Sequence, residues 1–478
     1  MSHILDQDAT DQLAALDKRR VSAEEILEAA IIRAEAVDPK LNALAARDLD
    51  RARQRARTID EQRARGEPPG RLAGLPMTIK DVLDVEGMPA SSGVRENLKR
   101  IAGDAAAVAR VRAQGAVIWA KTNAAPGASD WQTFNDLYGT TKNPWAPERT
   151  SGGSSGGAAA ALAARLTPLE VGSDNAGSLR VPASFCGVLA HQPTYGLVPL
   201  RGHVPPDPGS LSEPDLNVIG PMARSVRDLR LLLSVLSSGQ VPHEGRPEDL
   251  SELKAALWLD DPAFFIDGAV KDALKRFGMA LEAEGAKVHP VNSPIDGEEL
   301  LEVYVWLLYS LPTGASGPWT RVRNEVKRPF AKLAMSAGAD PQSWALCTLA
   351  ATARHREWLE ADEARREFRR RMKAFFDRWD ILVMPAAPVP PFPHDHRPRG
   401  KRKLQTADGR SAPYDAMVHW SALATVCGFP SVTLPTGVVD GLPIGVQIVG
   451  PADGDARLLS IAQGIEERLG GYERPPEF

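Results

Sequence analysis

Short apolar runs bounded by glycine and proline alternate with alanine-rich stretches from about residue 72 onward. Four of these runs have the length and composition of strands: LPMTIKDVLDV, AVIWAKTN, TPLEVGSD and WDILVMPA. Residues 104–114 and 156–165 have the character of helices. Because strands and helices alternate in this way, the pattern predicts an α/β fold with a large mixed β-sheet core flanked by helices.

The first sixty or so residues have a helical pattern of their own. Ser22 can cap a helix, and Glu25 follows it three positions later, as in a capping box. Residues 351–379 form a longer amphipathic pattern, with aromatic side chains toward one side. We therefore expect residues 1–65 to form a helical lead-in and residues 66–478 to form one compact α/β domain. The basic segment HDHRPRGKRKL, residues 394–404, is interpreted as a surface loop.

The charge and the cysteines of the chain exclude several classes of protein. Of its 478 residues, 61 are acidic and 57 are basic, so the net charge of the protein gives no overall electrostatic attraction to nucleic acid or to a membrane surface. No run of about 18 apolar residues could span a membrane. The three cysteines lie far apart without a CxxC spacing, which favours free thiols over disulfides or a zinc site. We expect a cytoplasmic protein that needs no cofactor and no metal and acts on a small molecule.

The most informative stretch is the glycine–serine run TSGGSSGG, residues 150–157, which leads directly into AAAALAARL. Such runs also occur as flexible linkers and as phosphate-binding loops. A linker does not fit, because a helix begins inside the run and a loop that enters a helix is ordered. A phosphate loop does not fit, because no lysine follows Gly156 or Gly157. The run therefore predicts a tight turn that presents hydroxyls and backbone N–H groups at a helix N-terminus.

A second glycine–serine element, GSDNAGSLR at residues 172–180, follows a strand-like run. The small residues Ala176 and Gly177 allow successive backbone N–H groups to converge on one point, as an oxyanion hole requires. Ser178 would lie at that point and is a candidate nucleophile. A serine in a turn can also simply bond to its own backbone, and for an isolated serine that role is the commoner one.

Lys80 ends the apolar run LPMTIK and is the candidate base. A lysine in that place usually reaches solvent or pairs with a carboxylate such as Asp81. If it is buried among hydroxyls instead, loss of hydration favours its neutral form, which can accept a proton. None of the nine histidines lies in a motif typical of a nucleophile's base, and His191 is interpreted as structural.

Taken in this order, the three elements resemble the amidase signature family, whose members use two serines and a lysine. Ser178 follows Ser154 by 24 positions, which agrees with the family pattern. The resemblance covers most of the chain, through KTNAAPGAS, TKNPWAPERTSGGSSGG, VPASFCGVLAHQPTYGLVP, ILVMPAAPVP and GLPIGVQIVGPADGDARLL. It implies the amidase-signature fold and a serine hydrolase that acts on C–N bonds other than peptide bonds.

By this resemblance Ser178 is the acylated nucleophile, Ser154 is a bridging serine that follows a cis peptide bond, and Lys80 is the base. The implied oxyanion hole consists of the backbone N–H groups of Asn175, Ala176, Gly177 and Ser178. The implied supporting residues are Ser155, Asp174 and Arg180, which surround and hold the catalytic groups, and Ala128, which lines the site near the bridging serine.

Ala176 departs from the family, which usually has two glycines before the nucleophile. Its methyl group is expected to modify specificity rather than to abolish activity, because the backbone N–H is retained. Specificity is expected to depend on the variable segments 126–138 and 300–350. Aromatic side chains in them could line an apolar pocket, although core packing explains them equally well: Trp131, Phe134, Tyr304, Trp306 and Trp319.

The expected activity is hydrolysis of an aryl or other hydrophobic carboxylic amide, and esters or carbamates would pass through the same kind of intermediate. Two alternatives stay open. The family includes the glutamine-hydrolysing component of tRNA-dependent amidotransferases, although GLVPLRGHVPPDPG, after the candidate nucleophile, is more similar to stand-alone amidases. A non-catalytic binding protein on the same scaffold is the other alternative. The expected partner is a small amide, without nucleic acid or membrane, and a homodimer is left open.

Overall fold

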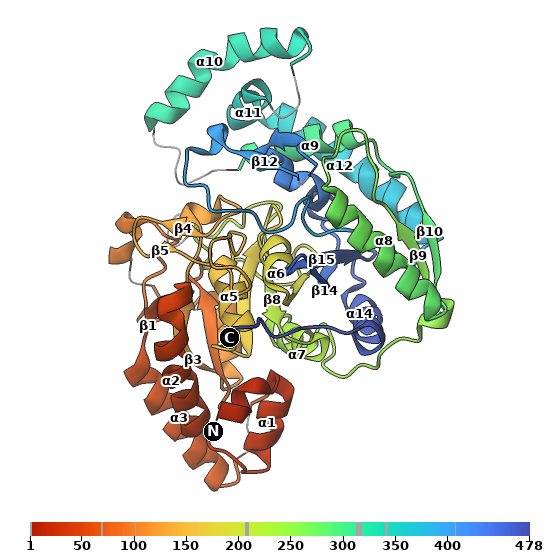
Figure 1. Cartoon of the computed structure of the whole chain (residues 1–478). Coiled ribbons are helices and arrows are strands. Elements are labelled where there is room, and N and C mark those ends of the chain that lie inside the picture. The colour runs from red at the N-terminus through yellow and green to blue at the C-terminus, as the bar shows by residue number, and fades with distance from the viewer. Residues whose placement is uncertain are drawn as a thin grey trace.

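A mixed β-sheet crosses the middle of the molecule, and helices pack around it (Figure 1). The structure is a computed structural model that describes residues 2–67, 70–100, 102–205, 210–311, 318–339, 343–406 and 408–478. In the order in which they lie side by side, the 11 strands of the sheet are β1 (Leu44–Arg47), β3 (Val117–Thr122), β2 (Pro76–Lys80), β6 (Leu169–Asp174), β8 (Val218–Ala223), β7 (Leu189–Gln192), β14 (Ser431–Val439), β15 (Leu442–Val449), β11 (Ile381–Pro385), β9 (Lys254–Leu257) and β10 (Lys287–Pro290).

Parallel and antiparallel pairs are mixed in this sheet. Strand β2 pairs in parallel with β3 on one side and with β6 on the other, whereas β6 pairs antiparallel with β8. Every residue of β2 and of β6 is buried, because both faces of the sheet are covered there. The predicted α/β fold is thus confirmed, and the four strand-like runs of the sequence form β2, β3, β6 and β11.

The described residues form helices that pack around the sheet. In sequence order, they are α1 (Ala9–Asp17), α2 (Ala23–Leu41), α3 (Leu49–Ala64), α4 (Ala106–Ala113), α5 (Gly156–Ala163), α6 (Arg180–Cys186), α7 (Val226–Leu236), α8 (Gly268–Ala283), α9 (Gly297–Tyr309), α10 (Pro318–Ser336), α11 (Trp344–Ala351), α12 (His355–Phe376), α13 (Ala422–Cys427) and α14 (Asp455–Leu469). The predicted helices at 104–114, 156–165 and 351–379 correspond to α4, α5 and α12. Helix α5 is buried along its whole length, which explains its alanine-rich sequence.

Two small antiparallel pairs lie outside the main sheet. Strand β4 (Phe134–Asn135) pairs with β5 (Gly139–Thr140), and β12 (Lys403–Gln405) pairs with β13 (Ser411–Pro413). The second pair includes the end of the basic segment 394–404, for which the sequence indicates a surface loop. Two residues of that segment, Lys403 and Leu404, therefore lie in a strand rather than in a loop.

The N-terminal segment packs against one end of the sheet. Helix α2 begins at the predicted capping box, in which the Ser22 hydroxyl accepts from the Glu25 N–H and the Glu25 carboxylate accepts from the Ser22 N–H. The helical pattern does not predict β1, which pairs antiparallel with β3. Because β1 has only four residues, its alternation is too short to recognise. The C-terminal Phe478 joins the apolar cluster of these helices, so the two ends of the chain pack together.

Helix α10 lies at the opposite end of the molecule from α1 (Figure 1). It packs on α11 through Ala331 and leaves Trp319, which is 84% exposed, on its outer side. Trp319 therefore lines no pocket. Of the variable segment expected at 300–350, residues 312–317 and 340–342 lie outside the described residues, as do residues 206–209 of the segment after Ser178.

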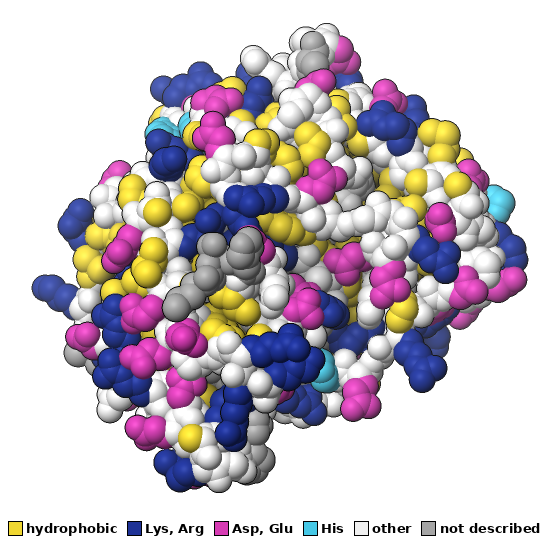
Figure 2. Space-filling model, turned by 60° about the horizontal axis from the view of Figure 1, so that its bottom comes forward, with side chains coloured by type: hydrophobic (Ala, Val, Ile, Leu, Met, Phe, Trp, Pro, Cys, Tyr) yellow, Lys and Arg dark blue, Asp and Glu magenta, His cyan; other side chains and the backbone are white. Residues whose placement is uncertain are grey.

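The surface carries both signs of charge. On the face shown in Figure 2, Lys and Arg side chains are interspersed with Asp and Glu side chains, in keeping with the formal net charge of -4. Within the ranges given above, no helix combines the length and the apolar character that crossing a membrane requires.

Candidate active site

Three chain segments bring the candidate residues together at the carboxyl ends of two central strands. Lys80 is the last residue of β2, Ser154 lies in the loop before α5, and Ser178 lies between β6 and α6. Because β2 and β6 are parallel neighbours, their carboxyl ends open on the same side. The N–H of Ser155 donates to the carbonyl oxygen of Ser178 at 3.2 Å, which joins the two serine loops. Ser154 and Ser178 line one cavity of about 190 Å³.

The amine of Lys80 is completely buried in this site. Its Nζ lies 2.8 Å from Ser154 Oγ, 3.2 Å from the carbonyl oxygen of Ser173 and 3.2 Å from Ser173 Oγ. Burial lowers the pKa of Lys80 from 10.5 to about 7, although the charges of Asp174 and Glu170 act in the opposite direction. A lysine with this pKa is substantially neutral near pH 7 and can accept a proton.

The nearest carboxyl groups do not neutralise Lys80 by a direct contact. Asp81 forms a buried ion pair with Lys121 at 2.8 Å, so the pairing of Lys80 with Asp81 that the sequence leaves open does not occur. Burial raises the pKa of Glu170 to about 8, and Thr122 donates to its carboxyl group at 3.2 Å. Glu170 is therefore mostly protonated at pH 7, and the ionised Asp174 at the end of the same strand pairs with Arg180 rather than with Lys80.

The loop that carries Ser154 is closely packed. The peptide bond between Gly153 and Ser154 is cis. A Cβ on Gly153 would lie 2.5 Å from the carbonyl oxygen of Asp130, so only glycine fits there. The N–H of Gly156 donates to Thr133 Oγ1 at 3.0 Å. These contacts show an ordered turn rather than a flexible linker.

The turn that carries Ser178 is held by a buried ion pair. Asp174 accepts a hydrogen bond from the N–H of Gly177 at 2.7 Å and binds the Arg180 guanidinium at 2.9 Å. Burial alone would raise the pKa of Asp174, but Arg180 and the backbone donors outweigh it, so this pKa is lowered. Gly177 has φ +90°, and a Cβ there would lie 3.1 Å from a methyl carbon of Val181. Position 177 therefore requires glycine.

The backbone N–H groups of this turn differ in their availability. Gly177 donates to Asp174, so its N–H is already engaged. In the part of the chain that the structure describes, no protein group accepts a hydrogen bond from the N–H of Asn175, Ala176 or Ser178. Three of the four donors expected for the oxyanion hole are thus available to a ligand.

Two aromatic side chains hold the carbonyl groups of the same turn. Trp131 Nε1 donates to the carbonyl oxygen of Ala176 at 2.7 Å, and the Tyr304 hydroxyl donates to that of Asn175 at 3.0 Å. Trp131 also lines the cavity, whereas Tyr304 does not. The remaining aromatic candidates do not line the cavity either: Phe134, Trp306 and Trp319.

The cavity has a largely apolar wall with a few polar groups. Ala128, with φ +57°, lines it as expected. Ser155 does not line it, but its buried hydroxyl donates to the Ser173 carbonyl oxygen at 3.4 Å, beside Lys80. The other wall residues that bear on substrate binding are Pro205, Pro214, Leu308, Tyr309, Leu311 and Arg399.

Comparison with known proteins identifies the family of this chain. A family model described as Amidase matches residues 25–459. This chain belongs to the amidase family. Indoleacetamide hydrolase of Bradyrhizobium diazoefficiens is 32% identical, over 97% of this chain and 86% of that protein. The A component of the glutamyl-tRNA(Gln) amidotransferase of Roseiflexus castenholzii is 31% identical, over 97% of this chain and 96% of that protein.

A solved structure described as an amidase has the same fold. Its TM-score is 0.79 at 29% identity, over 97% of this chain and 100% of that one. Members of the amidase family are hydrolases of C–N bonds, so this chain is an enzyme of that class.

The sequence does not predict two polar residues of this amidase's cavity, Arg399 and His203. Arg399 comes from the basic segment 394–404, lies 4.6 Å from the centre of the Trp131 ring and pairs with Asp415 at 2.6 Å. Arg402, from the same segment, is buried and pairs with Asp130 at 2.6 Å. The segment is largely exposed, as expected of a surface loop, but Arg402 is buried against Asp130 of the cavity wall and Arg399 itself lines the cavity.

His203 comes after β7, in the segment GLVPLRGHVPPDPG. The sequence alone assigns no role to this histidine. Its Nε2 lies 2.9 Å from Ser173 Oγ, which in turn contacts Lys80. The only signal in the sequence is its place beside prolines, in GHVPP, and this signal does not reveal what the ring contacts. His191, by contrast, is buried against Asp455 at 2.8 Å, away from the cavity, in keeping with a structural role.

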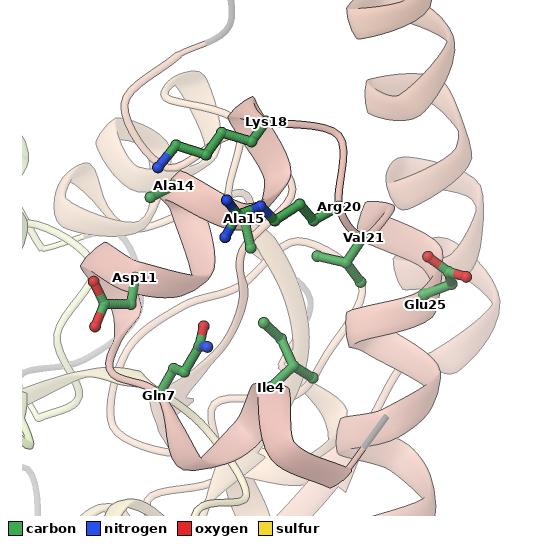
Figure 3. Close-up of a pocket in the computed structure, with 9 residues that line it drawn as sticks. All are labelled: Ile4, Gln7, Asp11, Ala14, Ala15, Lys18, Arg20, Val21 and Glu25. Atoms are coloured by element: carbon green, nitrogen blue, oxygen red, sulfur yellow. The ribbon is translucent and has the colours of Figure 1, made fainter.

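A second hollow of the amidase, about 430 Å³, lies among the first 25 residues (Figure 3). Its walls contain no serine, threonine, cysteine or histidine: Ile4, Gln7, Asp11, Ala14, Ala15, Lys18, Arg20, Val21 and Glu25. Although this hollow is larger than the cavity lined by Ser154 and Ser178, it is therefore not a better candidate for hydrolytic chemistry. Among the described residues, no group of three or more His, Cys, Asp or Glu side chains could hold a metal ion.

Proposed function

We propose that this enzyme hydrolyses a small carboxylic amide through an acyl-enzyme on Ser178, with Ser154 passing protons between Ser178 and Lys80. The main support is a single arrangement. The buried Nζ of Lys80 lies 2.8 Å from Ser154 Oγ, and Ser154 lines the same cavity as Ser178. Because the pKa of Lys80 is about 7, this base is available near neutral pH without help from a histidine.

The proposed reaction has two halves. As Ser178 Oγ attacks the amide carbon, its proton moves to Ser154, and the proton of Ser154 moves to Lys80. The tetrahedral intermediate then breaks its C–N bond, and the leaving nitrogen receives the proton back through Ser154. Water attacks the resulting ester by the same route, which releases the carboxylic acid and restores Ser178.

The oxyanion that forms in each half would be bound by the free N–H groups of the Ser178 turn. Asn175, Ala176 and Ser178 supply these donors, and the buried Asp174–Arg180 pair keeps the turn in place. Because the donors are fixed before substrate arrives, they need no reorganisation during the reaction. Removing one such donor costs on the order of 3 kcal/mol of transition-state stabilisation.

The proposed substrate class follows from the cavity wall. Trp131, Leu308 and Leu311 offer apolar contact, and Trp131 stands directly beside the Ser178 turn through its hydrogen bond to Ala176. A relative that is 32% identical over nearly the whole chain is an indoleacetamide hydrolase. An aryl or other hydrophobic amide is therefore the proposed substrate, and the corresponding esters or carbamates would react at the same centre.

The test is an assay of the purified full chain against indole-3-acetamide, aryl amides, short aliphatic amides, carbamates and matching esters. We expect the aryl amides to give the highest kcat/KM and Ser178→Ala to give no turnover. Ser129→Ala is the control, because it removes a hydroxyl of the same cavity that donates to the carbonyl oxygen of Pro126 and lies outside the proposed relay. Turnover by Ser178→Ala at more than about one hundredth of the wild-type rate would refute the proposal.

A second candidate, glutamine hydrolysis as part of an amidotransferase, is favoured by one observation. Glutamine carries an α-ammonium and an α-carboxylate, and the cavity is lined by one basic residue, Arg399, and one acidic residue, Asp130, among others. Relatives named as components of glutamyl-tRNA(Gln) amidotransferases are also similar over nearly the whole chain. Arg399→Met should abolish glutaminase activity if glutamine is the substrate, and should leave hydrolysis of a neutral aryl amide within about tenfold.

A further inference from the structure

The amine of Lys80 must direct its lone pair at one neighbour in order to act as a base. A neutral amine has two N–H donors and one lone pair. Three oxygens surround the Lys80 Nζ. Ser154 Oγ lies at 2.8 Å, and the carbonyl oxygen and the Oγ of Ser173 each lie at 3.2 Å. The carbonyl oxygen can only accept a hydrogen bond, but either hydroxyl could donate to the lone pair. Productive proton transfer requires Ser154, and not Ser173, to be that donor.

The tautomer of His203 resolves this ambiguity. Its Nδ1 lies 2.8 Å from the carbonyl oxygen of Pro205, which can only accept, so Nδ1 carries the hydrogen. Burial lowers the pKa of His203 to about 4, so the ring is neutral near pH 7. Its Nε2 is therefore an acceptor, and it lies 2.9 Å from Ser173 Oγ. The hydroxyl hydrogen of Ser173 is consequently donated to His203.

We propose that His203 is a positioning residue that fixes the direction of the proton relay by holding the Ser173 hydroxyl as an acceptor toward Lys80. This inference rests on the proposed roles of Lys80 and Ser154. With the Ser173 hydrogen committed to His203, both N–H groups of neutral Lys80 are taken by the two oxygens of Ser173. The lone pair is left for the hydroxyl of Ser154, which is the one of these three oxygens that can then donate to it.

Replacing His203 distinguishes its role as a hydrogen-bond acceptor from a role in filling space. His203→Leu introduces an apolar side chain of similar size that offers no acceptor to the Ser173 hydroxyl, which becomes free to donate to Lys80. We expect kcat to fall roughly 10- to 100-fold and KM to change by less than about twofold, because a misdirected hydroxyl must be displaced before each proton transfer. His203→Gln has an amide N–H for Pro205 and an amide oxygen for Ser173, so it should recover kcat to within about threefold of wild type.

A double-mutant cycle tests whether His203 acts through Ser173. In Ser173→Ala there is no hydroxyl to orient, so adding His203→Leu should lower kcat by less than about twofold. A loss in that background as large as in the wild type would overturn the proposal, because His203 would then act on the substrate or on packing. Wild-type kcat in His203→Leu, or no better kcat in His203→Gln than in His203→Leu, would also overturn it.

The proposed function and this inference fail in different ways. Lys80→Ala should be inactive if the relay exists, and thermal melting of every variant shows which of them are folded. An active Lys80→Ala would refute the relay itself. An inactive Lys80→Ala together with an additive cycle would leave the relay standing and reject only the role of His203.

Discussion

The pH dependence of turnover is the most direct test of Lys80 as the base. Burial lowers its pKa from 10.5 to about 7. At pH 7 about half of the molecules then carry a neutral Lys80, against about one in 3,000 at the ordinary pKa of 10.5. Since only the neutral form accepts a proton, kcat/KM should fall about tenfold per pH unit below the pKa and level off about one unit above it.

The assay measures initial rates at substrate concentrations far below KM, from pH 5.5 to pH 9.5 at constant ionic strength. Lys80→Ala should lose the acid limb together with most of the activity. Lys80→Arg should not restore either of them, because a guanidinium stays charged. Glu170→Gln is a useful control: the pKa of Glu170 is raised to about 8, and its ionisation close to Lys80 would broaden the wild-type curve. The variant should give a sharper limb at equal or lower pH.

Two results would refute this reasoning. One is a wild-type profile that stays flat from pH 6 to pH 8. The other is a Lys80→Ala variant with near-normal turnover and an unchanged acid limb, which would show that another group is the base. His203 cannot produce a limb near pH 7 instead, because burial lowers its pKa to about 4.

Further predictions concern the nucleophile, metals, the buried amine and the oxyanion turn. A sulfonyl fluoride or phosphonate should add one label to the peptide that contains Ser178 and abolish turnover, whereas complete inactivation with a label elsewhere would contradict the assignment. Exhaustive chelation should leave kcat unchanged, and a loss restored by zinc or manganese would contradict a relay of two serines and a lysine. Lys80→Met should raise the free energy of unfolding at pH 7. Because the pKa of Lys80 is lowered in the folded state, the folded wild type binds fewer protons than the unfolded chain between about pH 7 and 10.5. The stability gained by Lys80→Met should therefore shrink as unfolding is measured at higher pH in that window. Gly177→Ala should destabilise the protein by about 1–3 kcal/mol in urea unfolding, because φ is +90° and Val181 lies 3.1 Å from the new methyl group.

Local sequence predicts the parts of this enzyme whose neighbours lie nearby in the chain. The strand that ends at Lys80, the glycine turn before α5 and the turn at Ser178 are each specified within about ten residues, and the resemblance to the family adds their spacing. The sequence leaves the burial of Lys80 open, because a lysine at a strand end reaches solvent unless its neighbours prevent it. Those neighbours, Ser154 and Ser173, are 74 and 93 positions away.

The cavity wall is harder to predict because distant segments build it. Arg399 reaches Trp131 across more than half of the chain, from a segment whose high charge indicates exposure. Arg399 stays partly exposed and pairs with Asp415, which comes close to it when β12 and β13 pair. Conversely, Trp319 has a large aromatic side chain of the kind that lines pockets, but it is exposed on the outer side of α10. Side-chain type alone therefore cannot distinguish a wall of the cavity from an exposed helix face.

The alanine at position 176 changes the shape of the site without changing the backbone that the chemistry needs. The positive φ of the turn occurs at Gly177, and Ala176 is not among the residues with positive φ, so its methyl group imposes no conformational strain. The carbonyl group of Ala176 is held by Trp131, and its N–H has no protein acceptor in the described part of the chain. This N–H is thus available to a ligand, and Ala176 lines the cavity together with Trp131. We therefore propose that alanine at this position affects which acyl groups fit, and not how the oxyanion of the proposed reaction is stabilised.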